Sequence, residues 1–200
     1  MHQTKSETFL PDGLSIRPAV KEDAPLIAQC VLAAVGLIDM SLPPEKENCK
    51  EFPVARRVCA EPDTLFSYNN AVIACIDGED AGALVSYDGA LYAKAREKTF
   101  RMFREELGND NSGYAMETGP GEYYLDSIAL RPEFRGHDMG LDILRDTILK
   151  ARDKGFRRFT LIVDVDAPRK IAYYSRLGFK PGCTMETFGS TYLKMVLEYD

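Results

Sequence analysis

The chain has 200 residues and a mass of 22.4 kDa, which fits a single globular domain. Its 45% hydrophobic and 28% charged residues are ordinary for a folded protein and exclude global disorder. The net charge of −6 at pH 7 lacks the basic surplus of a general nucleic-acid binder, so we expect no nucleic-acid partner. The longest apolar run, Val31 to Ile38, is too short to span a bilayer, so we expect no membrane partner.

The cysteines and histidines argue against a disulfide framework and against a metal site. There are five cysteines, none in a C-x-x-C pair, and two histidines, His2 and His137. We therefore expect reduced thiols, no metal, and a cytoplasmic protein. The beginning of the chain has no apolar signal core, which also favours a cytoplasmic protein. Residues 1–13 are interpreted as a leader and residues 14–200 as one domain.

The spacing of apolar residues divides the first half of the chain into short strands and helices. Asp77-Gly78 separates two of the strands and favours a hairpin-like pair. The expected elements are a strand at 14–19, a helix at 21–36, loops around one short helix at 41–63, strands at 70–76 and 81–87, a helix at 91–107 and a mobile-looking stretch at 108–121.

The second half of the chain is more regular and predicts a βαβα unit. Its two strands should be parallel, with a right-handed crossover. The expected elements are a strand at 123–130, a helix at 141–154, a strand at 159–165, a helix at 168–178, and closing strands at 183–188 and 192–199. The fold class is therefore α/β (α+β): a mixed, mostly antiparallel sheet with one central parallel strand pair, flanked by helices.

A glycine-containing turn connects the strand 123–130 to the helix after it. Here the first amides of the helix have no internal partner and favour an anion, and Arg135 can add a charged contact. By itself a strand–glycine–helix turn is more often a plain tight turn. The sequence 135–140 is neither a Walker loop nor a G-x-G-x-x-G fingerprint.

The wider sequence IALRPEFRGHDMG, followed by a helix, a strand and IAYYSRLGF, resembles the GNAT family of acyl-CoA-dependent N-acetyltransferases. The resemblance is strongest over 123–180, which would be the CoA-binding core of an N-acetyltransferase domain. It implies that acetyl-CoA or CoA is the co-substrate and that the Arg135–Gly140 loop binds the CoA pyrophosphate. The residues that would bind the cofactor are Ile128, Ala129, Leu130, Arg135, Gly136, His137, Asp138, Met139, Gly140, Ala167 and Tyr174.

Two positions depart from the family pattern. Asp138 stands where the family most often has Gly, and Ala167 stands where many members have Asn. Asp tolerates the left-handed backbone region, so the turn can survive, but a carboxylate is unfavourable beside a pyrophosphate. We therefore predict that the Asp138 side chain points to solvent. The ten Lys or Arg and four Asp or Glu of 145–180 fit either CoA phosphates or a solvated helix face.

Acetyl transfer to an amine needs a group that takes the amine proton and a group that protonates the thiolate. By the resemblance, Tyr174 would lie beside the CoA sulfur and donate that proton, unless it only packs its helix on the sheet, a role that Tyr173 could fill. Asp126 and Glu122 lie four residues apart and are the candidate bases, although either could be a solvated strand-end carboxylate. A backbone amide of the strand 126–130 would stabilise the thioester oxygen.

The acceptor is suggested only by charge. Residues 105–130 contain six carboxylates and no Lys or Arg, which favours a cationic small-molecule or peptide amine, or is simply a polar surface loop. The resulting hypothesis is direct attack of a primary amine on acetyl-CoA in a ternary complex. The alternative is a non-catalytic acyl-CoA-binding sensor or scaffold. Self-association as a homodimer stays open, with Phe100 and Phe103 as interface or core residues.

Overall fold

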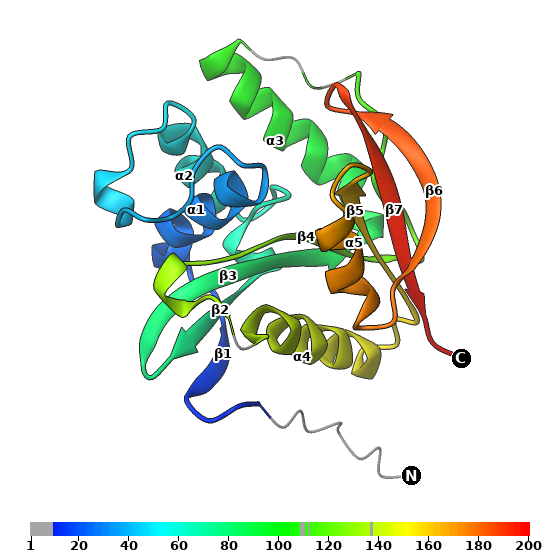
Figure 1. The fold of residues 1–200 in the computed structure, drawn as a ribbon. Helices are drawn as coiled ribbons and strands as arrows, with labels where there is room; N and C mark the ends of the chain where they lie inside the picture. The colour runs from blue at the N-terminus through cyan, green and yellow to red at the C-terminus, as the bar shows by residue number, and fades with distance from the viewer. Residues whose placement is uncertain (1–9, 109–110, 112, 137) are drawn as a thin grey trace.

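The computed structural model describes residues 10–108, 111, 113–136 and 138–200, so residues 1–9 of the expected leader lie outside it. The described strands form a seven-stranded sheet in the order β1-β2-β3-β4-β5-β7-β6 (Figure 1). The strands are β1 (Leu14–Pro18), β2 (Ala71–Ile76), β3 (Glu79–Asp88), β4 (Tyr123–Leu130), β5 (Arg158–Asp164), β6 (Lys180–Thr187) and β7 (Ser190–Glu198). The α-helices are α1 (Ala24–Ala34), α2 (Phe52–Ala60), α3 (Tyr92–Leu107), α4 (Met139–Asp153) and α5 (Pro168–Ser175).

The sheet confirms the expected fold class. Neighbouring strands pair antiparallel except β4 and β5, which are parallel and are connected through α4. The hairpin-like pair predicted around Asp77-Gly78 is β2 and β3. Asp77 and Gly78 both have positive φ, as a tight two-residue turn requires.

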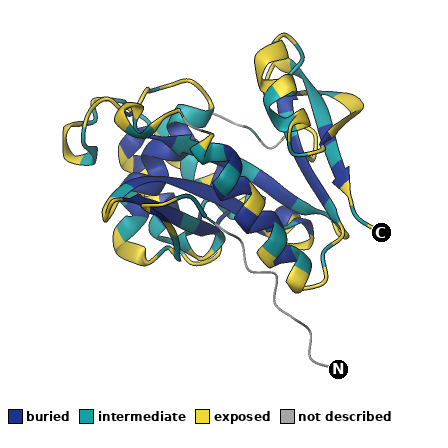
Figure 2. Cartoon of the chain, turned by 60° about the horizontal axis from the view of Figure 1, so that its bottom comes forward, coloured by how far each residue is buried: buried dark blue, intermediate teal, exposed yellow. Residues whose placement is uncertain are grey.

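Two hydrophobic clusters lie on opposite faces of the sheet. Helices α1, α2 and α3 cover one face, and their apolar residues pack against Ile73, Val85 and Tyr124. Helices α4 and α5 cover the other face, where Leu144 and Ile148 pack against Phe159. Figure 2 shows that burial follows the sheet and the inward faces of these helices, whereas the β6 edge strand is mostly exposed.

Several boundaries differ from the sequence prediction. The first helix starts with a 3₁₀ turn over Lys21–Asp23, and the α-helix begins only at Ala24. α5 ends at Ser175 rather than at Gly178, because the chain tightens into i→i+3 bonds after Tyr173. Phe100 is buried and Phe103 packs against the core, so both are core residues of this fold.

Candidate active site

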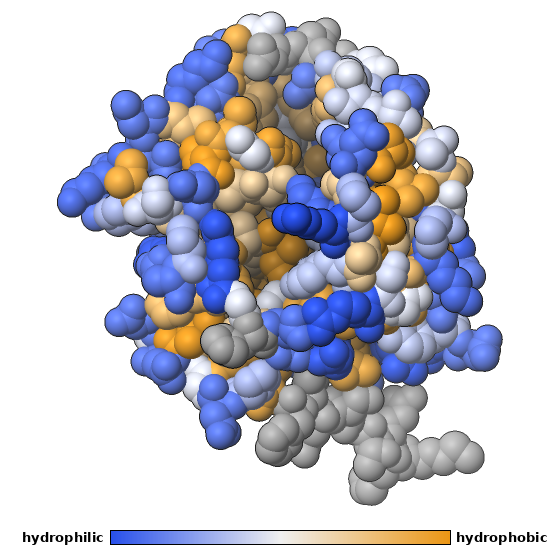
Figure 3. Space-filling model, in the orientation of Figure 1, coloured by the Kyte–Doolittle hydropathy of each residue, from blue (hydrophilic) through white to orange (hydrophobic). Residues whose placement is uncertain are grey.

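The parallel strands β4 and β5 pair over only two residues each. Tyr123 faces Phe159 and Tyr124 faces Thr160, and no further pair follows. Beyond that point β4 stays paired with β3, while β5 stays paired with β7 along its whole length. The sheet therefore divides into two halves, β1–β4 and β5–β7, that separate toward the carboxyl ends of β4 and β5. In Figure 3 the surface is hollowed between α1 and α2 on one side and α5 on the other, and apolar side chains line this hollow.

A β-bulge lies where this separation begins. Val85 of β3 faces Ser127, and the next residue, Ser86, faces Leu125, so Asp126 is the extra residue of β4. Such a bulge bends its strand and changes the direction of the side chains beyond it. Tyr124 and Ala129 consequently both pack toward α1, although they are five positions apart and would lie on opposite faces of a regular strand. The bulge places a carboxylate at the opening of the sheet.

Asp126 is held in a mostly apolar setting by two hydroxyl groups. The Tyr87 hydroxyl donates to one carboxylate oxygen at 2.5 Å, and the Ser127 hydroxyl donates to the other at 2.7 Å. Burial raises the pKa of Asp126 to about 7, with a further contribution from the negative charge of Glu117. The residue as a whole is half-buried. A carboxylate of this kind can accept a proton near neutral pH from a molecule in the hollow.

Glu117 is a residue of this site that sequence reasoning did not single out. Its two carboxylate oxygens accept hydrogen bonds from the hydroxyls of Tyr92, at 2.7 Å, and Tyr124, at 2.5 Å. Burial raises the pKa of Glu117 as well. The sequence showed it only as one of six carboxylates in a polar stretch. The tyrosines that bind it come from α3 and β4, and only the fold brings them together.

Glu122, the other candidate base, lies in a different environment. Its carboxylate accepts hydrogen bonds from Lys194 of β7 at 2.7 Å, from Arg158 of β5 at 3.2 Å, and from the hydroxyls of Thr118 and Thr160. Burial acts to raise the pKa of Glu122, but these donors prevail and the pKa is lowered. The structure therefore does not bring Glu122 and Asp126 together. Glu122 connects the two halves of the sheet.

The predicted pyrophosphate loop lies before α4. Gly136 has a φ of +101° and Asp138 a φ of 60°, so both occupy the left-handed region that the family glycines favour. Arg135 donates to the carbonyls of Leu130, at 2.8 Å, and Asp39, at 2.6 Å, and thus fixes the loop to the end of β4. His137 lies outside the described residues.

Asp138 has a partner that the sequence did not reveal. Both of its oxygens accept hydrogen bonds from the guanidinium of Arg176, just after α5, and this pair lowers the pKa of Asp138. The Asp138 side chain is 50% exposed, so it reaches solvent as predicted while an arginine balances its charge.

The tyrosines of α5 face the start of α4 and the core. A Cβ on Gly140 would collide with the Tyr173 hydroxyl, so glycine at this position lets α5 approach the first turn of α4. Tyr174 packs against Tyr173 and Phe179, and burial raises its pKa to about 12. A phenol with this pKa keeps its proton at neutral pH, and it is a weaker acid than an ordinary phenol.

The remaining predicted binding positions lie around the opening. Ile128 packs with the α4 and α5 face, Ala129 packs toward α1, and the buried Leu130 ends β4. Ala167 caps α5 without a side-chain hydrogen bond. Within the described residues, no three His, Cys, Asp or Glu side chains are arranged to hold a metal ion, and no helix is long and apolar enough to cross a membrane.

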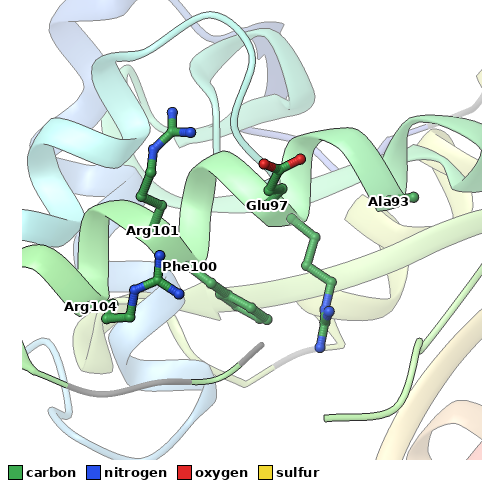
Figure 4. Close-up of a pocket in the computed structure, with 6 residues that line it drawn as sticks. Ala93, Glu97, Phe100, Arg101 and Arg104 are labelled. Atoms are coloured by element: carbon green, nitrogen blue, oxygen red, sulfur yellow. The ribbon is translucent and has the colours of Figure 1, made fainter. Parts of the chain in front are cut away.

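A separate cavity of about 150 Å³ lies along α3 and includes none of these residues. It is lined by Ala93, Arg96, Glu97, Phe100, Arg101 and Arg104. Figure 4 shows Glu97 and Arg101 pointing away from the Phe100 ring, on the opposite side of the helix. Phe100 packs edge-on against Phe188 at the tip of the β6–β7 hairpin.

The mixed sheet divides at its one parallel strand pair, and the turn before α4 is suited to binding an anion. These two features define an acyltransferase-like fold. The family model described as "Acetyltransferase (GNAT) family" matches residues 45–179, and the chain belongs to that family. No curated protein matches the chain.

Solved structures agree with this assignment. One solved structure, described as the crystal structure of an acetyltransferase, is 30% identical in sequence to this chain. The match covers 93% of this chain and 100% of that protein's chain, with a TM-score of 0.72. An N-acetyltransferase from Staphylococcus aureus Mu50 is 20% identical, with coverage of 92% and 100% and a TM-score of 0.75. A GNAT family acetyltransferase from Elizabethkingia anophelis, solved with acetyl-CoA bound, is 14% identical, with coverage of 94% and 99% and a TM-score of 0.54.

Proposed function

We propose that this acetyltransferase transfers the acetyl group of acetyl-CoA to a primary amine by direct attack within a ternary complex. The observation that carries the proposal is the separation of β4 from β5 directly beside Asp126, a half-buried residue whose carboxyl pKa is raised to about 7 by burial. The opening supplies room for the donor, and the carboxylate supplies the base. The acetyl-CoA bound to the Elizabethkingia anophelis protein supports the choice of donor.

The residues around the opening fit acetyl-CoA. Beyond Tyr124, the side of β4 that faces β5 has no strand partner, so backbone groups of 128–130 can pair with the pantetheine amides. The turn over 135–140 presents the amino end of α4, which favours phosphate. We assign the pyrophosphate to this turn, and Ala167, which precedes α5, to the rim of the same site.

Two side chains handle the protons of the reaction. Asp126 takes a proton from the bound ammonium group, the neutral amine nitrogen then attacks the thioester carbonyl, the C–S bond breaks, and the remaining excess proton on the nitrogen passes to solvent. Tyr174, protonated at neutral pH, donates a proton to the departing CoA thiolate. A backbone amide of the unpaired part of β4 stabilises the oxygen of the tetrahedral intermediate. Glu122 has a lowered pKa and two basic partners, Arg158 and Lys194, so we assign it a structural role and not a catalytic one.

The acceptor that suits this site is a cationic amine. Asp126 and Glu117 both belong to the face of the sheet covered by α1 and α3, and their combined charge attracts an ammonium group. This attraction predicts that the KM for the acceptor rises with ionic strength. A KM that does not change between low and physiological salt would contradict the proposed steering.

The five cysteines are free thiols, which suits a reducing compartment such as the cytoplasm.

Two measurements on the same protein distinguish an enzyme from a protein that only binds acyl-CoA. Saturating acetyl-CoA should raise the melting temperature by several degrees. Adding an amine should then release CoA thiol at a rate that depends on both the enzyme and the amine. A rise in melting temperature without thiol release on any amine would support a binding protein instead.

A further inference from the structure

The connection between β3 and β4 is much longer than the sheet requires. These strands are antiparallel neighbours, which a two-residue turn can join. Instead, residues 89–122 lie between them and include the whole of α3. The two ends of this insertion are held together, because the Gly89 amide donates to the Glu122 carbonyl at 2.8 Å. Residues 89–122 therefore form an insertion that leaves the pairing of β3 with β4 intact.

The insertion connects the two halves of the sheet on the face opposite α4. Lys194 of β7 donates to the backbone carbonyl of Glu117 at 3.0 Å. At the β6–β7 tip, the Phe188 ring packs against Phe100 of α3, at 6.1 Å between centroids, and against Tyr114, at 4.9 Å. Figure 1 shows α3 and the tip of this hairpin meeting above the divided strands. This arrangement closes one side of the space beside Asp126.

The insertion also contributes a charged group to that space. Glu117 and Asp126 bind the hydroxyls of neighbouring rings, because Tyr124 donates to Glu117, Tyr87 donates to Asp126, and the centroids of these two rings are 5.7 Å apart. The groups that face the two carboxylates are Tyr87 of β3, Tyr92 of α3, Tyr124 and Ser127 of β4, with Arg96 and Lys194 near Glu117. Each Glu117 oxygen uses one acceptor position for a tyrosine and keeps another for a ligand.

We infer that Glu117 binds a second ammonium group of the acceptor, and that the acceptor is a small di- or polyamine. This inference rests on the proposed function, in which the opening of the sheet defines the active site and Asp126 takes the proton of the reacting amine. One nitrogen then lies at Asp126 and loses its proton, while another stays charged at Glu117. Two nearby carboxylates repel each other in the empty site, and a ligand with two positive charges relieves that repulsion. The closure by α3 and Phe188 favours a slender acceptor over a polypeptide.

The test compares two amines with the same four-carbon chain, 1,4-diaminobutane and n-butylamine, at saturating acetyl-CoA. The wild-type enzyme should show a kcat/KM at least about tenfold higher for the diamine, the effect of one charged hydrogen bond. The E117Q variant should raise the KM for the diamine by about 10- to 100-fold and so remove most of the preference for the diamine over n-butylamine. Loss of the Glu117 charge should also lower the pKa of Asp126, so the acidic limb of the n-butylamine profile should move to lower pH.

The matched control is E97Q, which removes an exposed carboxylate from the same insertion, on the side of α3 away from Phe100. It should keep the wild-type preference for the diamine. Equal wild-type rates for the two amines would overturn the inference without any variant, and so would an E117Q variant that loses activity on both amines equally. Acetylation of neither amine by the wild-type enzyme would instead contradict the proposed function itself.

Discussion

The hydroxyl of Tyr87 donates a 2.5 Å hydrogen bond to the carboxylate of Asp126, and this bond crosses from β3 to β4 at the bulge. It holds the Asp126 side chain in place where the backbone of β4 departs from regular pairing. The bond favours the ionised carboxylate, whereas burial and Glu117 favour the protonated form, and burial prevails. The result is a carboxyl group whose protonation changes within the physiological pH range.

This raised pKa predicts that Asp126 lowers the stability of the folded protein at neutral pH. In the unfolded chain an Asp titrates near pH 3.9, so the folded state binds the extra proton between about pH 4 and 7. The stabilisation from this group is complete below about pH 4 and is lost as the pH rises through about 7. The D126N variant should therefore melt at a higher temperature than the wild type at pH 8, with a smaller difference at pH 5.

Differential scanning calorimetry of both proteins at the two pH values checks this prediction. S86A, which alters a neighbouring hydroxyl bonded to Tyr123 instead, serves as a control for general effects near the bulge. A D126N protein that is less stable than the wild type at pH 8 would show that the ionised carboxylate is well compensated and not a raised-pKa base.

The position of Tyr174 predicts a loss of turnover without a loss of binding. Y174F removes the hydroxyl but keeps the ring contacts with Tyr173 and Phe179. The kcat should fall by about 10²-fold, within the range for one general acid, because the thiolate leaves without a proton donor. The rise in melting temperature with acetyl-CoA should stay as in the wild type. Unchanged turnover would remove Tyr174 from the mechanism and leave it as a packing residue.

The ion pair between Asp138 and Arg176 predicts a compensating pair of variants. Removing the arginine in R176A leaves the Asp138 carboxylate without its partner beside the proposed phosphate site, so acetyl-CoA should bind several-fold more weakly. D138G should change the affinity little, because Arg176 already balances this carboxylate. The double variant should bind better than R176A alone, which a double-mutant cycle by calorimetry can measure. A large gain in affinity from D138G alone would contradict this account.

Much of the fold could be predicted from local patterns. The regular sequence after Tyr123 defines β4, α4, β5 and α5, because apolar spacing and glycine punctuation act within short stretches of chain. The turn proposed to bind pyrophosphate and the family resemblance lie in the same region. The boundaries of α1 and α5 were wrong by a few residues, since 3₁₀ turns satisfy the same local signals as the ends of α-helices.

The chemistry of the site could not be predicted in the same way. Asp126 and Glu122 were both candidate bases in the sequence, and their long-range partners distinguish them: Tyr87 for Asp126, and Lys194 with Arg158 for Glu122. The bulge at Asp126 also depends on pairing with β3, which no local pattern specifies. Glu117 was hidden for the same reason, because its polar surroundings in sequence resemble a surface loop.

The central claim is that the carboxylate at the bulge takes the amine proton in an acetyl-CoA-dependent reaction. The most direct measurement is turnover with acetyl-CoA and 1,4-diaminobutane for the wild type, D126N and E122Q, with acetyl-CoA binding followed by melting temperature in parallel. We predict that D126N loses about 10²- to 10⁴-fold in kcat and still binds acetyl-CoA. E122Q should instead lose stability and retain the wild-type pH profile. A fully active D126N protein, or an E122Q protein that is stable but inactive, would contradict the assignment of the base.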